Sequence, residues 1–172
     1  MQSQLLDMEN KIQLSKEEII MGFVASCIED MADNLGVDYY EVYRRMESVK
    51  MIDEYIIPNY EVLHSESRKN LTDGLIDTLK RWEGSEIAVI EISDDHRTVS
   101  EEQHRKVRNI IRWQRIGCIV VKISETLNVS LKEALDLFYK SETCRRFYDE
   151  ETGLYLQGNL YVLNDFLAEI SR

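Results

Sequence analysis

A chain of 172 residues with 44% apolar and 31% charged side chains has the composition of a folded globular protein, which excludes a wholly disordered chain. One proline and seven glycines leave few helix breakers, so the composition favours an all-α fold. No apolar run has the length of a signal peptide or a membrane span, and we therefore expect a cytoplasmic protein with no membrane partner.

The net charge of −11 is unevenly distributed. Residues 1–84 hold 9 basic and 17 acidic side chains, whereas residues 98–172 hold 11 of each. An acidic front half repels phosphate backbones and suits a basic partner protein, although solubility alone also accounts for an acidic chain.

The N-terminal residues 1–14 precede the first helix signal. Leu5, Met8 and Ile12 lie at helical spacing, which predicts either an extra docked helix or an arm that orders on a partner.

A first helical unit is predicted over residues 15–84. Ser15 and Glu18 form a capping box, and Gly36 is a helix stop. A second helix begins at Asp38, with Glu41 completing an acid-type box. Apolar residues on one face of the first helix step by four, three and four: Val24, Ile28, Met31 and Leu35.

The rest of this unit is divided by Pro58, which closes a short helical piece over residues 50–57. Residues 59–67 read as a turn. A last helix follows over residues 67–82 and ends near Gly84, with one apolar side formed by Leu71, Leu75, Ile76 and Leu79.

Residues 85–99 are predicted to be a linker between units. Within it, residues 87–92 (IAVIEI) are rich in β-branched side chains, which makes them the best strand candidate in the chain.

A second helical unit is predicted over residues 100–172, opened by a capping box of Ser100 and Gln103. A shift of 92 residues places the apolar face of the first helix over Ile116, Val120 and Ile123, and the Asp38 cap over Ser130 with Glu133. We therefore predict two tandem related units of about four helices each. The alternative is that two amphipathic helix pairs align by chance.

Candidate catalytic groups are few. Cys27 and Cys118 lie in apolar helical patterns typical of core thiols. His64 has serine neighbours but no glycine-rich elbow, so we interpret it as a turn residue whose ring bonds a backbone carbonyl. The tripeptide 94–96 (Asp-Asp-His) lacks calcium-loop spacing. We expect no catalytic residue, metal or cofactor.

Four arginines line one face of the long second-unit helix, stepping by three, four and three: Arg105, Arg108, Arg112 and Arg115. This ridge could contact the acidic half of the chain or a second copy, remain solvated, or bind nucleic acid, in that order of preference. The opposite side is predicted to enter the core through Val107, Ile110, Ile111 and Cys118.

The chain has nine tyrosines, and most of them are predicted to lie at half-buried edges of the core. A subset could form an interface, since tyrosine combines apolar area with a polar tip. The candidates for a recognition surface are Tyr39, Tyr40 and Tyr60.

Residues 16–82 resemble a family of short bacterial helical proteins of unknown function, through the acidic cap before YYEVYRRMES and the Y-x-V-L-H turn of Tyr60, Val62, Leu63 and His64. Residues 107–170 look like a divergent second copy without the histidine, with Leu154, Tyr155 and Leu156 in the approximate place. Relatives tend to be encoded beside proteins that look like ADP-ribosyltransferase toxins, which implies an antitoxin or accessory role.

The leading hypothesis is therefore a non-enzymatic, acidic protein-interaction module that masks a basic, toxin-like partner, with a homodimer left open. The alternative is a nucleic-acid-binding regulator that uses the arginine ridge.

Overall fold

The computed structural model describes residues 13–84 and 99–171, with side chains from residue 108 onward in the second range. Every regular element in these two ranges is helical, which confirms the predicted all-α class. The candidate strand at residues 87–92, the linker and residues 1–12 lie outside the described residues.

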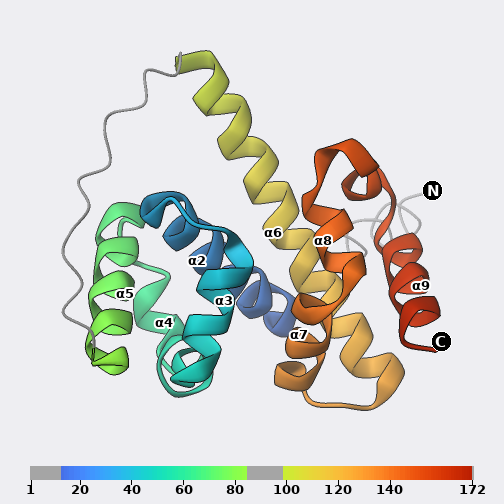
Figure 1. The fold of residues 1–172 in the computed structure, drawn as a ribbon, viewed down its shortest axis with the longest axis horizontal. Coiled ribbons are helices and arrows are strands. Elements are labelled where there is room, and N and C mark those ends of the chain that lie inside the picture. Colours follow the sequence, from blue (N-terminus) through green and yellow to red (C-terminus); the bar gives the residue numbers. More distant parts are fainter. Residues whose placement is uncertain (1–12, 85–98, 172) are drawn as a thin grey trace, which may run out of the picture.

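The first range contains five elements, shown in blue to green in Figure 1. Ser15 and Glu18 form the predicted capping box, and Gly36 ends the first helix with φ 65°. The Asp38 side chain caps the second helix by accepting a hydrogen bond from the Tyr40 amide. Within the described residues, Glu41 does not accept the predicted reciprocal hydrogen bond from the Asp38 amide. The elements are α2 (Lys16–Leu35), α3 (Tyr39–Ser48), the π-helical turn η1 (Ile52–Ile56), α4 (Tyr60–Leu63) and α5 (Arg68–Glu83).

The predicted turn at residues 59–67 is partly wrong, because it contains the single helical turn α4. The helical piece before it ends ahead of Pro58, as predicted, although Ile57 directly before the proline keeps helical backbone angles (φ −62°, ψ −49°). The predicted apolar side of α5 is buried at all four positions: Leu71, Leu75, Ile76 and Leu79.

The second range contains six elements: α6 (Val99–Leu127), α7 (Leu131–Lys140), α8 (Glu142–Tyr148), η2 (Glu150–Thr152), η3 (Leu154–Leu156) and α9 (Asn159–Ile170). Both bounds of α7 lie 92 residues after those of α3, and Ser130 with Glu133 forms the predicted capping box. Gly36 and Asn128, also 92 apart, both have positive φ. That the two ranges are related copies stays a prediction.

The core is continuous across both ranges, because α2 packs along α6 at the centre of the molecule (Figure 1). The helix backbones approach closely at two glycines. A Cβ atom on Gly117 would lie 2.1 Å from the Glu18 carbonyl oxygen and 2.8 Å from the Gly22 amide nitrogen. Only glycine fits at this crossing.

One prediction about α6 is wrong. Ile110 and Ile111 were expected in the core but are 48% and 53% exposed. The first core residues described on α6 are Trp113 and Ile116. Just before them, Asn109 and Arg112 are the residues that lie beside α2 and α8, and the start of α6 extends beyond the other helices (Figure 1).

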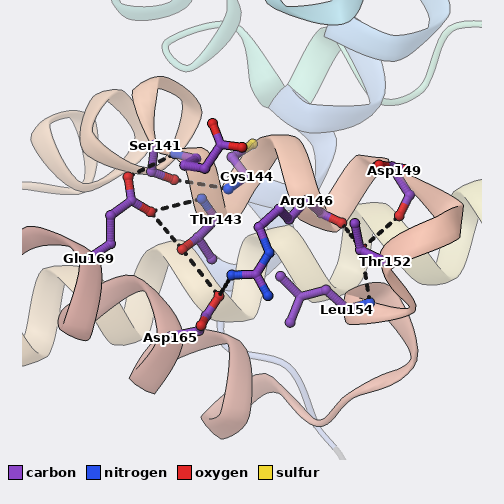
Figure 2. A network of polar contacts seen from close by, with 10 residues as sticks. Ser141, Thr143, Cys144, Arg146, Asp149, Thr152, Leu154, Asp165 and Glu169 are labelled. Atoms are coloured by element: carbon purple, nitrogen blue, oxygen red, sulfur yellow. Dashed lines mark hydrogen bonds and ion pairs between the residues drawn. The ribbon is translucent and has the colours of Figure 1, made fainter.

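Helix α9 is attached to the start of α8 by polar contacts (Figure 2). The Glu169 carboxylate accepts hydrogen bonds of 2.8 Å from the backbone amides of Glu142 and Thr143. Asp165 accepts one of 2.7 Å from Arg146. A carboxylate at the N-terminus of α8 satisfies two amides that the helix leaves without partners, so this network has a structural explanation.

Candidate functional site

The arginine ridge of α6 does not form one uniform surface. Arg105 lies on α6 with its side chain outside the description, while Arg108 is half exposed and Arg112 is mostly buried. Both face the Glu150 carboxylate, at 3.8 Å from Arg108 Nη1 and 3.7 Å from Arg112 Nη2. Two of the predicted ridge residues therefore share one acidic side chain of their own half.

Arg115 is held inside the molecule. Its Nε donates to Asn159 Oδ1 at 2.9 Å, and its other two guanidinium nitrogens donate to the carbonyls of Tyr155 and Gln157. The guanidinium also lies 5.0 Å from the centre of the Phe147 ring. Arg115 thus fixes the segment between η3 and α9 and has a structural role.

Glu29 of α2 is buried opposite the ridge, at 7% exposure. Its Oε2 accepts a 2.7 Å hydrogen bond from Trp113 Nε1 and lies 4.0 Å from Arg112 Nη1. Its Oε1 and the Nε of Arg112 are buried without a hydrogen-bond partner. Burial raises the pKa of Glu29 to about 7, against the opposing effects of Arg112 and of the Trp113 hydrogen bond. The carboxyl group therefore titrates near neutral pH.

A first cleft of about 310 Å³ opens beside this pair, between α2, the start of α3, α6 and α8. Tyr39 and Tyr148 line it with stacked rings whose centres are 3.7 Å apart, and Arg112 lies 5.3 Å from the Tyr148 ring centre. Acidic, basic and aromatic groups thus meet in one place.

A second, larger groove of about 520 Å³ lies along Arg108, Arg112 and Arg115. Its other walls are mostly apolar and include Ile111, Phe147, Tyr155 and Leu156. Arg108 and Arg112 line both cavities.

Of the other predicted site residues, Tyr39 lies close to the ridge, whereas Tyr40, Tyr60 and His64 do not line either cavity. Tyr39 lies in the first cleft, whereas the Tyr40 ring lies 5.8 Å from the Arg145 guanidinium. Tyr60 and His64 stack at 4.6 Å on α4, and His64 Nδ1 lies 2.8 Å from the Tyr60 carbonyl oxygen. The ring of His64 therefore contacts a backbone carbonyl, as predicted.

Sequence reasoning missed Glu29, Trp113 and Tyr148. The available signal was Glu29 itself, an acidic residue four positions after Ala25 and three before Ala32, on the apolar side of α2. An ionisable residue on a buried face is a candidate for a functional role.

The three cysteines are free and buried. Burial raises the pKa of Cys27 to about 12, and burial with a hydrogen bond to Glu18 raises that of Cys118 to about 11. These thiols stay protonated at neutral pH and match the predicted core role.

Within the described ranges, no cluster of three or more histidine, cysteine, aspartate or glutamate side chains is arranged to hold a metal ion. The tripeptide 94–96 lies outside those ranges. None of the described helices has the length and apolar character of a membrane span.

The described ranges therefore form an all-α fold with a central helix crossing and a polar cleft beside it. Residues 22–82, about a third of the chain, match the family model described as "Protein of unknown function (DUF3791)". The match agrees with the resemblance found over residues 16–82. No curated protein and no solved structure matches the chain.

Proposed function

We propose that the chain is a non-enzymatic protein-interaction module whose acidic first half binds and masks a basic protein. The observation that supports this proposal most directly is the surface around α4. Val62 is 64% exposed there, between the exposed acids Glu61 and Glu66. An apolar side chain within an acidic rim fits a basic partner.

This docking face, defined as Tyr60, Glu61, Val62, His64 and Glu66, has a rigid base. Tyr60 packs edge-on against Phe23 of α2 at 5.2 Å and stacks on His64. Glu61 forms a 2.9 Å ion pair with Lys16, which anchors α4 to the start of α2. A preorganised aromatic and aliphatic surface loses little entropy on binding.

The acidic character extends beyond α4. Exposed acids on the same half include Glu17, Glu41, Glu54 and Asp73, which make no ion pair within 4 Å in the described part of the chain. Such charges speed encounter with a basic protein and favour it over nucleic acid. The resemblance to proteins encoded beside toxins makes a toxin-like protein the expected partner.

The test is affinity capture from the native host with the full chain, followed by titration of the captured protein against defined variants. Val62→Arg should abolish binding, whereas Leu160→Arg, at a residue of equal exposure (65%) on α9, should not. Binding should also weaken as salt rises. Equal affinity for both variants, or no stoichiometric protein partner, would contradict the proposal.

The alternative is a nucleic-acid-binding regulator that uses Arg108 and Arg112. It ranks second because Arg115 is committed internally and Arg112 is mostly buried. Capture of nucleic acid, seen as high absorbance at 260 nm and lost with Arg108→Glu, would favour it.

A further inference from the structure

The guanidinium groups of Arg108 and Arg112 have fewer hydrogen-bond partners than those of Arg45 and Arg115. Arg45 donates two hydrogen bonds of 2.8 Å to Glu83, and Arg115 uses three nitrogens. In the described part of the chain, neither Arg108 nor Arg112 makes a hydrogen bond, and their carboxylate neighbours lie at 3.7–4.0 Å.

This arrangement is costly unless another group completes it. A guanidinium has five N–H donors, and leaving donors unsatisfied in a mostly buried side chain costs free energy. Arg112 has a buried Nε without a partner, and Glu150, the carboxylate between the two heads, is itself half exposed. The two guanidinium groups could therefore bind another oxyanion more closely than they hold Glu150.

The groove beside these heads supplies the other half of a ligand site. Its volume of about 520 Å³ lies within the range of roughly 300–1,000 Å³ common for small-molecule sites. Tyr155 contributes partly exposed aromatic surface, and the apolar side chains of Ile111 and Leu156 are 53% and 72% exposed. Arg115 fixes the segment that carries Tyr155, so this wall is held in place.

We propose that this groove binds a small organic anion: a carboxylate or phosphate carried on an apolar or aromatic body. The oxyanion draws the guanidinium groups of Arg108 and Arg112 away from Glu150, which lines the first cleft, and accepts hydrogen bonds from them. The body lies against Ile111 and Tyr155. Positive charge beside apolar walls complements such a ligand. The site is separate from the docking face on α4, so the two proposals stand or fail independently.

The experiment is a titration of the full chain, by calorimetry and by NMR, with four probes. Phenylacetate and phenyl phosphate carry both ligand features, 2-phenylethanol lacks the charge, and inorganic phosphate lacks the body. We expect each aromatic anion to bind at least about tenfold more tightly than the two partial probes. The order of phenylacetate and phenyl phosphate then identifies the preferred head group.

Three variants locate the site. Arg108→Gln should weaken binding of the better probe at least about tenfold. Glu150→Gln should strengthen it several-fold, because it removes the competing internal carboxylate, and a partly unfolded protein could not produce this gain. Arg44→Gln, at an exposed arginine on α3, is the matched control and should leave binding unchanged.

Three results would overturn the proposal. One is no binding of either aromatic anion at about 1 mM, where even weak specific sites begin to fill. Another is binding that Arg108→Gln and Glu150→Gln leave unchanged. The third is inorganic phosphate binding as tightly as phenyl phosphate, which would remove the role of the apolar groove.

Discussion

Helices α2 and α6 meet in two physically different ways. At Gly22 and Gly117 their backbones approach closely, and a methyl group on Gly117 would overlap backbone atoms of α2. Seven residues further along α2, the same two helices meet through Glu29, Arg112 and Trp113. That second contact is buried, yet one carboxylate oxygen and one guanidinium nitrogen lack hydrogen bonds.

The two contacts have opposite energetic character. Close packing of helices gains dispersion energy and excludes water, so the glycine crossing stabilises the fold. A buried ion pair gains little net stability, because desolvation offsets the attraction, and an apolar pair of equal volume is often as stable. The Glu29–Arg112 contact therefore adds little net stability to the fold.

Breaking the glycine crossing should have the largest effect on the free energy of unfolding. Gly117→Ala places a methyl group against backbone atoms of α2, which cannot move aside as a side chain could. We expect the free energy of unfolding to fall by about 3 kcal/mol or more, measured by urea denaturation. An unchanged midpoint would mean that the two helices separate without cost.

Removing the charge of Glu29 should have the next largest effect on the free energy of unfolding, and the size of this effect depends on pH. The native pKa of about 7 lies above the ordinary 4.5, so between these values the native state binds more protons than the unfolded state. Native stability therefore falls as pH rises through this window, by about 1–3 kcal/mol. Glu29→Gln cannot titrate and should lack this loss.

The measurement is the free energy of unfolding of both proteins at pH 5 and pH 8. The difference between Glu29→Gln and the unsubstituted protein should move in favour of the variant at pH 8. The same difference at both pH values would show that Glu29 is ionised in the native state throughout.

Much of the fold could be predicted from local sequence, but most of the site could not. Caps at Ser15 and Ser130 and the apolar face of α5 depend on residues within a few positions of one another. The Glu29–Trp113 bond joins residues 84 positions apart, and no periodicity encodes that pairing. Periodicity also identified Ile110 and Ile111 as apolar positions without revealing that both are about half exposed.

A second polar contact between the two halves, in which the buried donor is hydrogen-bonded, is a reference for the Glu29–Arg112 contact. Tyr43 of α3 is buried and donates a 2.6 Å hydrogen bond to Asp136 of α7. Tyr43→Phe should reduce the free energy of unfolding by about 1–2 kcal/mol, because it removes a hydrogen bond to a charged group. Tyr161→Phe, at a tyrosine that is 56% exposed, is the control and should have no effect. A neutral Tyr43→Phe would mean that Asp136 is fully satisfied by Lys140, which it contacts at 2.6 Å.

The smallest change in the free energy of unfolding is expected at a glycine whose Cβ position is open. This substitution also tests why Gly117→Ala is destabilising. Gly74 lies inside α5, and a methyl group added to it would have no neighbouring atom within 4 Å, in contrast to Gly117 on α6. Gly74→Ala should raise the free energy of unfolding by about 0.5–1 kcal/mol, because alanine loses less backbone entropy in a helix. Thermal unfolding of the two alanine variants side by side gives the comparison. Opposite signs would assign the cost at Gly117 to its neighbours on α2, whereas a loss at both would assign it to glycine's own place in these helices.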